Sequence, residues 1–179
     1  MRSLNLRLER GERLAVSGPN GCGKSLLIDT LLGGRPPAAG RVRRRGGTRW
    51  CRSHQEPRWQ SGTLASHLRE EGIDATRFRN ILGVFGIEGD AFDRPLETFS
   101  EGERKKADLV RSFLEPAHVW VWDEPLNYLD IESREQVEDV IRRDEPTLLV
   151  VEHDEWFLER IATRRLELAG DGGWRFVDP

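Results

Sequence analysis

A glycine-rich loop between a short apolar segment and a helix-forming segment constrains the fold most. Residues 18–25 read GPNGCGKS and match the pattern G-x-x-x-x-G-K-S. The preceding residues 13–17 predict a short buried strand, and residues 26–32 predict a helix that packs on a sheet and stops at Gly33-Gly34. Glycines let a backbone turn tightly and aim successive N–H groups at phosphate oxygens near a helix N-terminus. This order of strand, loop and helix predicts an α/β domain that binds nucleotide phosphates.

Every residue of this loop is a candidate contact to the phosphates of a nucleotide. Lys24 is predicted to reach the β- and γ-phosphates, and Ser25 to bind Mg²⁺. Cys22 is interpreted as a small residue that fills the loop, and its place at a helix N-terminus predicts sensitivity to alkylation. The candidate nucleotide contacts are Gly18, Pro19, Asn20, Gly21, Cys22, Gly23, Lys24, Ser25 and Leu26.

A second apolar segment ends in two carboxylates. Residues 118–125, HVWVWDEP, predict a central strand of a parallel sheet because they are apolar and β-prone. A carboxylate at the C-terminal end of such a strand faces the crevice in which open α/β sheets bind ligands. Asp123 is therefore predicted to hold Mg²⁺, through Ser25 or a water molecule, and Glu124 to polarise the attacking water. The alternative is that both carboxylates simply end a buried strand before Pro125.

Two more segments are predicted to bring polar side chains to this site. Residues 147–151 predict a buried strand that leads to His153, whose imidazole can donate to a γ-phosphate oxygen. Residues 48–55 predict a strand that leads to Gln55, whose amide suits a mobile ligand of Mg²⁺ or of the attacking water. Trp59 either stacks on a base or packs in the core, and core packing is the favoured interpretation. The predicted catalytic residues are Glu124, His153 and Gln55, and the predicted metal ligands are Ser25, Gln55 and Asp123.

A short polar turn, residues 99–103 (FSEGE), precedes the carboxylate strand. Ser100 and Gly102 are predicted to open a helix that runs from Glu103 to residue 114, so that a hydroxyl, backbone N–H groups and a helix dipole converge on an anion. Ser100, Gly102 and Glu103 are therefore candidate nucleotide contacts. A capping box between Ser100 and Glu103 fits the same residues, and both interpretations can hold because capping positions the groups.

These motifs occur in the order found in ATP-binding cassette (ABC) domains, and the chain resembles that family. The motifs that carry the resemblance are, in order, the phosphate loop, Gln55, residues 100–103, Asp123-Glu124, Asp130 and His153. The resemblance implies a P-loop NTPase fold: a mostly parallel sheet flanked by helices, with a small helical insert and a shortened antiparallel β-subdomain. It also implies an ATPase that uses ATP and Mg²⁺. In cassettes the Ser100 turn meets the γ-phosphate held by another cassette, so the implied partner is a second cassette, in trans or from a missing N-terminal half.

Within the family, residues 123–130 (DEPLNYLD) and 151–154 (VEHD) are most similar to ABC-F proteins. This resemblance implies a cytoplasmic factor that acts on the ribosome or its RNA without inserting into a membrane, in a branch that protects ribosomes from antibiotics. Two alternatives remain open. One is the ATP-binding subunit of a membrane transporter, and the other is a nucleotide-binding domain without independent activity.

Some positions depart from the family pattern. Leu26 stands where the family usually has a Thr that helps to hold the α-phosphate, and Phe99 and Glu101 replace a Leu and a Gly. The first strand of a cassette, with its adenine-stacking aromatic, is expected to be missing, because Met1 lies only seventeen residues before Gly18. The chain is expected to be the second cassette of an ABC-F protein, beginning inside that cassette.

Length and composition favour one ATPase domain. The 179 residues suffice for one hydrophobic core. The sequence contains no run of eighteen apolar residues of the kind that predicts a membrane-spanning helix. Residues 1–57 and 98–179 are predicted to form the ATP-binding core, and residues 58–97 the helical subdomain, with helices over 63–70 and 75–85. Residues 165–168 and 174–177 are predicted to pair as strands. Pro36-Pro37 and Gly46-Gly47 are predicted to bracket a small hairpin.

Charge limits the partners. The net charge of −3 provides no global attraction to nucleic acid, and the two cysteines argue against a disulfide framework. A local basic stretch stands out. It is interpreted either as a solvated hairpin face or as a surface that contacts RNA phosphates in a salt-dependent way. Its members are Arg41, Arg43, Arg44, Arg45, Arg49 and Arg52.

Overall fold

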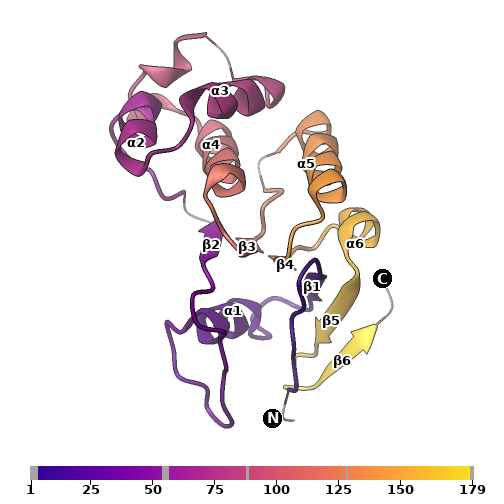
Figure 1. The fold of residues 1–179 in the computed structure, drawn as a ribbon. Helices are drawn as coiled ribbons and strands as arrows, with labels where there is room; N and C mark the ends of the chain where they lie inside the picture. Colours follow the sequence, from indigo (N-terminus) through magenta and orange to yellow (C-terminus); the bar gives the residue numbers. More distant parts are fainter. Residues whose placement is uncertain (1–3, 54–56, 88, 128, 178–179) are drawn as a thin grey trace.

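A six-stranded sheet forms the centre of the computed structural model, which describes residues 4–53, 57–87, 89–127 and 129–177 (Figure 1). The strand order is β2-β3-β4-β1-β5-β6. Neighbouring strands from β2 to β5 run parallel, and β6 pairs with β5 in the antiparallel direction. The strands are β1 (Arg13–Ser17), β2 (Trp50–Ser53), β3 (Val119–Asp123), β4 (Leu148–Val151), β5 (Arg164–Leu168) and β6 (Trp174–Val177). The predicted α/β fold is confirmed, including the central position of β3.

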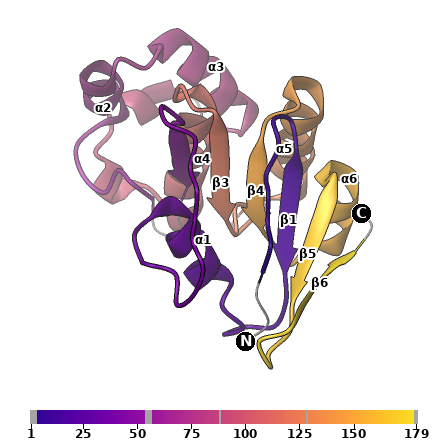
Figure 2. The ribbon, with the colours of Figure 1, turned by 60° about the horizontal axis from the view of Figure 1, so that its bottom comes forward.

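Helices cover both faces of this sheet. They are α1 (Lys24–Leu32), α2 (Leu64–Glu71), α3 (Ala75–Val84), α4 (Glu101–Leu114), α5 (Ile131–Asp144) and α6 (Glu155–Ile161), with short 3₁₀ turns at Gly89–Phe92 and Leu96–Thr98. Ile28 of α1 packs with Val121 and Val151 on one face. The other face packs against α4, α5 and α6 (Figure 2). Alternate strand residues therefore serve two cores, as the pleat of a sheet requires.

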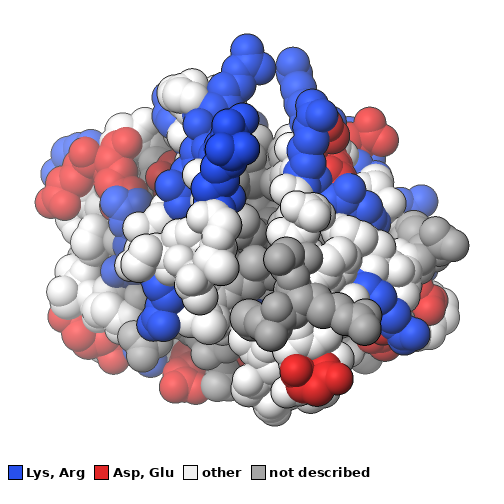
Figure 3. Space-filling model, turned by 90° about the horizontal axis from the view of Figure 1, so that it is seen from below, with Lys and Arg blue, Asp and Glu red and all other residues white. Residues whose placement is uncertain are grey.

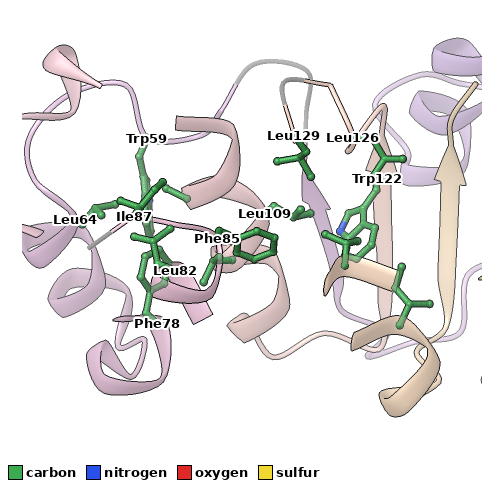
Figure 4. Close-up of a cluster of buried hydrophobic side chains, with 14 of the residues drawn as sticks. Trp59, Leu64, Phe78, Leu82, Phe85, Ile87, Leu109, Trp122, Leu126 and Leu129 are labelled. Atoms are coloured by element: carbon green, nitrogen blue, oxygen red, sulfur yellow. The ribbon is translucent and has the colours of Figure 1, made fainter. Parts of the chain in front are cut away.

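The helical insert contains α2 and α3 and shares its core with the sheet. Figure 4 shows Trp59, Phe78 and Leu82 in the insert, and the same buried cluster continues to Trp122 on β3. The Trp59 ring stacks on His67 with centroids 5.0 Å apart, and its Nε1 donates to Glu71 at 2.8 Å. Trp59 is therefore a core residue, and the predicted helices over 63–70 and 75–85 are confirmed within one residue at each end.

The hairpin expected between Pro36-Pro37 and Gly46-Gly47 is wrong. Residues 33–49 contain neither helix nor strand, although Thr48 N donates to Arg45 O across the Gly46-Gly47 turn at 3.2 Å. The two prolines lack N–H groups for a ladder, and like charges on facing strands would repel. The segment also offers no apolar face that a hairpin could bury.

Helix α1 packs on the sheet through Ile28, as predicted, while Leu26 is 41% exposed. Helices α5 and α6 are not among the elements expected from the sequence. Helix α5 is rich in charge, and α6 is only seven residues long, so neither shows a long apolar period.

Candidate nucleotide-binding site

The phosphate loop joins β1 to α1 and depends on glycines. The φ angles of Gly18, Gly21 and Gly23 are 143°, 77° and 107°, a region that other residues rarely adopt. A Cβ atom on Gly18 would also lie 2.3 Å from the carbonyl oxygen of Leu168. Helix α1 begins directly after Gly23, so its free N–H groups face the loop, as an anion site requires.

Lys24 places a positive charge inside this loop. The side chain is buried, and its Nζ donates to the carbonyl oxygens of Gly18 at 2.8 Å and Pro19 at 3.1 Å. The ammonium thus lies at the concave side of the turn, where an anion would meet both the charge and the backbone N–H groups. This position agrees with the predicted contact between Lys24 and phosphate.

Asp123 lies at the end of β3 and fits a magnesium ligand. Its Oδ1 is buried and has no hydrogen-bond partner among the described residues, and its Oδ2 lies 3.9 Å from Nη2 of Arg52. Burial raises the pKa of Asp123, and Arg52, Ser25 and Lys105 partly oppose this rise. A buried carboxylate oxygen without a partner suits a cation.

The described part of the chain has no group of three or more His, Cys, Asp or Glu side chains that could hold a metal ion. Magnesium at this site would therefore depend on Asp123, the Ser25 hydroxyl, the phosphates of the nucleotide and water. This ligand set is the usual one for Mg²⁺ in phosphoryl-transfer proteins.

Glu124 follows Asp123 in a strained backbone conformation, with a φ of 52°. Its N–H donates to Val151 O at 2.8 Å, which extends the pairing of β3 with β4. Asn127 Nδ2 donates to the carboxylate Oε2 at 2.8 Å, and His153 Nε2 lies 3.6 Å from Oε1, beyond hydrogen-bond range. Left-handed conformations of non-glycine residues cost free energy and cluster at functional sites.

His153 follows β4 and shares a cavity with the phosphate loop. The cavity, of about 520 Å³, is lined by His153 and by Gly18, Pro19 and Asn20 of the loop, with Ser17, Glu155, Glu167 and Leu168. The predicted proximity of His153 to the phosphate site is thus present in the structure. Gln55 lies outside the described residues.

The Ser100 turn forms the expected capping box. Ser100 Oγ accepts from Glu103 N at 3.1 Å, and Ser100 N donates to Glu103 Oε2 at 2.7 Å. Burial tends to raise the pKa of Glu103, but the hydrogen bonds from Ser100 and Arg94 outweigh it and lower the pKa. Helix α4 begins at Glu101, two residues before the predicted start. Ser100 is exposed, and none of Ser100, Gly102 and Glu103 lines the cavity at the phosphate loop.

Asp130 caps the N-terminus of α5. Its Oδ1 accepts from Ser133 N at 2.8 Å, and its Oδ2 accepts from Lys106 Nζ at 2.7 Å. The Lys106 and Ser133 donors hold the pKa of Asp130 well below its usual range. Because Lys106 lies on α4 and also donates to Phe85 O at 2.9 Å, this contact joins α4, α5 and the insert.

Two cationic residues near Asp123 were not predicted as site residues. Arg52, grouped above with the exposed basic stretch, is instead half-buried, and its Nη1 donates to Asp29 Oδ1 on α1 at 2.7 Å. Lys105 on α4 is only 2% exposed. Burial lowers its pKa, while the carboxylates of Asp108, Asp123, Glu124 and Glu152 oppose that shift.

Glu152 is a third residue that sequence reasoning missed. It is buried, its Oε1 accepts from His153 N at 2.7 Å, and its Oε2 accepts from Leu126 N at 3.2 Å. The carboxylate therefore joins the segment after β4 to the segment after β3. Its position directly after a buried strand, next to His153, was the available signal.

Known proteins resemble this chain in sequence and in fold. The family model described as ABC transporter matches residues 1–127. The chain is 31% identical to the ABC transporter F family member 2 of Arabidopsis thaliana over 94% of the chain and 26% of that protein. It is 30% identical to the ribosome protection protein VmlR of Bacillus subtilis over 96% of the chain and 32% of that protein. The chain thus spans about a quarter to a third of the length of these curated relatives.

A solved structure described as the ATP-binding subunit of an ABC transporter matches the fold with a TM-score of 0.83. It shares 22% identity and aligns over 97% of this chain and 81% of the other, so the likeness concerns the fold. No helix in the described part of the chain has both the length and the apolar character needed to cross a bilayer. The matched residues 1–127 include the phosphate loop, the Ser100 turn and the Asp123-Glu124 pair, and on this basis the chain belongs to the ABC transporter family of ATP-binding domains, with ABC-F proteins among its relatives.

Proposed function

We propose that the chain binds ATP with Mg²⁺ and hydrolyses it as one cassette of a paired ATPase. The observation that carries the proposal is the Glu124–His153 pair at the ends of adjacent strands, beside the phosphate loop. It combines a carboxylate able to accept a proton with an imidazole able to donate to phosphate. This arrangement supports hydrolysis in addition to binding.

The residues divide the work of phosphoryl transfer. Lys24 and the N–H groups at the start of α1 bind the β- and γ-phosphates, while Ser25 and Asp123 hold the metal. When bound, Mg²⁺ neutralises the charge that develops on the phosphate oxygens. Glu124 Oε1 orients a water molecule and accepts its proton as the water oxygen bonds to the γ-phosphorus. The bond from that phosphorus to the bridging oxygen breaks, which yields ADP and phosphate.

His153 acts as a donor in this scheme. Its Nε2 lies 3.6 Å from Glu124 Oε1, so the imidazole lies close enough to the carboxylate to donate to a γ-phosphate oxygen placed beside it. Asn127 restrains the other carboxylate oxygen, and Glu152 fixes the backbone of His153. Gln55 is retained as a proposed ligand of the metal or the water.

A second cassette is part of the proposal. Ser100 is exposed, and the capping box fixes its hydroxyl at the start of α4, next to N–H groups that favour an anion. Because the Ser100 turn does not line the cavity of its own phosphate loop, it is available to a nucleotide held by another cassette. Activity of the chain by itself is therefore expected to be low.

The ribosome is the proposed site of action, in the cytoplasm. The relationship to a protein named for ribosome protection supports this. The sequence of residues 123–130, which resembles that of ABC-F proteins, supports it too. Protection from an antibiotic is the finer form of the proposal. The alternative, an ATP-binding subunit of a membrane transporter, draws on the description of the matching family model and on a likeness of fold.

Turnover measurements test the ATPase. ATP turnover is measured with Mg²⁺ for the chain by itself and for the chain joined to an ABC-F cassette. Lys24→Ala is the test variant, and Arg142→Gln, at an exposed position, is its control. We expect turnover that Lys24→Ala abolishes and Arg142→Gln preserves. Turnover that survives Lys24→Ala would contradict the assignment. Co-sedimentation of the joined protein with ribosomes tests the site of action separately, and its failure would favour the transporter alternative.

A further inference from the structure

The loop between α1 and β2 concentrates positive charge. Residues 33–49, here named the arginine loop, contain six arginines and no Asp or Glu, although the whole chain carries a net charge of −3. All six arginine residues are exposed. They are Arg35, Arg41, Arg43, Arg44, Arg45 and Arg49.

These arginines have no ion-pair partner among the residues that the structure describes. Elsewhere the chain pairs many of its arginines with carboxylates, for example Arg94 with Glu103 and Arg134 with Asp154. Within the described part of the chain, no arginine of the loop lies within 4.0 Å of a carboxylate oxygen. The loop therefore presents positive charge that no described carboxylate neutralises.

Arg44 has a different role from its neighbours. Its Nε donates to Leu31 O at 2.6 Å and its Nη2 donates to Thr30 O at 2.9 Å, so it satisfies carbonyl groups at the C-terminus of α1. This contact anchors the loop to the helix that follows the phosphate loop. Arg41, Arg43 and Arg45, on either side of the anchor, remain available to a partner.

The backbone of the loop is irregular. Residues 33–49 form neither helix nor strand, and Gly40 and Gly47 both turn with a φ of 78°. The loop lies at the lower left of Figure 1. Figure 3 looks from that lower side and shows Lys and Arg side chains that stand out from the surface.

The chemistry of the loop favours a phosphate backbone. Guanidinium groups bind phosphate oxygens through two parallel hydrogen bonds, and a row of them matches a repeated phosphate. A membrane surface fits less well, because amphipathic helices bind membranes through apolar and aromatic side chains. The arginine loop is not helical, contains no aromatic residue, and has Val42 as its only large apolar residue.

We propose that the arginine loop docks on the phosphate backbone of folded RNA, with Arg41, Arg43 and Arg45 in contact with phosphates. This inference rests on the proposed action at the ribosome and names the surface that touches it. Recognition through phosphates is independent of base sequence and decreases with salt. Docking leaves the nucleotide site on the same chain free, because none of these arginines lines its cavity.

Fluorescence anisotropy with a labelled RNA duplex tests the proposal. The duplex has about 20 base pairs, which exceeds the roughly 16 base pairs that one double-stranded RNA-binding domain spans. The full chain is compared with a loop variant, Arg41→Gln with Arg43→Gln and Arg45→Gln. The matched control, Arg69→Gln with Arg77→Gln and Arg142→Gln, removes three exposed arginines from other elements. Arg44 is left unchanged because it anchors α1.

We expect the loop variant to bind RNA at least about tenfold more weakly at low salt. Its plot of log affinity against log salt should be shallower by about 2 to 3, since each phosphate contact contributes close to one unit of slope. The control should lose less than about threefold. Binding of a fluorescent ATP analogue should be the same in all three proteins, which verifies folding.

Three outcomes of the binding measurements would overturn the inference. The wild-type chain could fail to bind RNA at low salt, the control could lose as much affinity as the loop variant, or the chain could bind anionic phospholipid vesicles but not RNA. Ribosome co-sedimentation separates this inference from the proposed function. If the loop variant joined to its partner cassette still co-sediments as well as wild type, another surface makes the contact and only the docking assignment is wrong.

Discussion

His153 Nε2 lies 3.6 Å from Glu124 Oε1, so two residues from the ends of different strands form one polar pair beside the phosphate loop. Pairing of β3 with β4 in register, with Asp123 opposite Val151, makes this approach possible. Asn127 holds the second carboxylate oxygen of Glu124. The carboxylate is thus restrained through Oε2, while Oε1 lies beside His153 without a hydrogen bond to it.

Glu124→Gln should abolish hydrolysis without abolishing binding. The amide keeps the shape of the side chain but cannot accept a proton, and loss of such a group costs about 10²- to 10⁴-fold in rate. Turnover of ATP and binding of a fluorescent analogue measure the two effects. The exposed Glu132→Gln in the first turn of α5 is the control. Turnover of Glu124→Gln within about threefold of wild type would show that Glu124 does not assist the attacking water.

The two free cysteines should react at very different rates. Cys22 in the phosphate loop is half-exposed and should be alkylated first, and bound ATP should protect it. Burial raises the pKa of Cys51 to about 12, so its thiol should stay protonated and unreactive in the folded chain at pH 8. Mass spectrometry after a timed reaction with iodoacetamide, with Cys22→Ser as control, distinguishes the sites. Rapid labelling of Cys51 in folded Cys22→Ser would contradict the burial.

The same shift predicts how stability changes at alkaline pH. The folded thiol of Cys51 keeps its proton up to about pH 12, whereas an unfolded thiol loses it near its usual value of 9.0. The unfolded state therefore binds fewer protons above pH 9, and stability should fall as pH rises. Cys51→Ala should reduce the loss of unfolding free energy between pH 9 and 10.5. Urea denaturation measures this free energy, and Cys22→Ala is the control. An equal effect of the two substitutions would argue against Cys51 as the source.

Asp130→Ala should destabilise the chain by about 1 kcal/mol at pH 7, because α5 loses its N-cap. Asp130→Asn should cost less, since Asn also caps helices. The pKa of Asp130 lies well below the usual 3.8, so its contribution is present at neutral pH and is lost as pH falls below about 4. Urea denaturation should show the difference between wild type and Asp130→Ala narrowing in that range. A difference that stays constant down to pH 3 would contradict this ionic role.

Asp108→Ala should be more costly, by about 3 kcal/mol. Asp108 is buried between α4 and β2, where it accepts from Ser53 Oγ at 2.7 Å and from Arg111 Nε at 3.0 Å. Without the Asp108 carboxylate, the Arg111 guanidinium stays buried. It keeps its ion pair with Glu115, which is partly exposed. Chemical denaturation measures the cost, with Asp108→Asn as the variant that keeps an acceptor for Ser53. A cost below about 1 kcal/mol would indicate that Arg111 finds another partner.

Local backbone chemistry made much of the site predictable. The phosphate loop needs glycines at fixed positions, because its φ angles of 143°, 77° and 107° lie in a region that residues with a Cβ atom rarely adopt. The capping box of Ser100 and Glu103 likewise satisfies N–H groups that any helix start exposes. Buried parallel strands are continuous apolar segments, so β1, β3 and β4 were identifiable, together with the polar residues that follow them.

Contacts between distant segments were not predictable in the same way. Arg52 belongs to a run of arginines in the sequence, yet it pairs with Asp29 and approaches Asp123, while its neighbours in the arginine loop remain exposed. Lys105 and Lys106 are adjacent, yet one is buried near the carboxylates and the other reaches Asp130. Charge alone does not tell which basic residue is buried.

The sequence by itself therefore determined the fold class, the phosphate loop and the identity of the candidate carboxylates, because these depend on short-range backbone geometry and apolar patterning. Only the tertiary structure decided that Glu124 and His153 form a pair and that Glu152 joins the ends of β3 and β4. Strand order and register set these outcomes. They bring side chains together or leave them without partners, and a linear pattern does not contain that information.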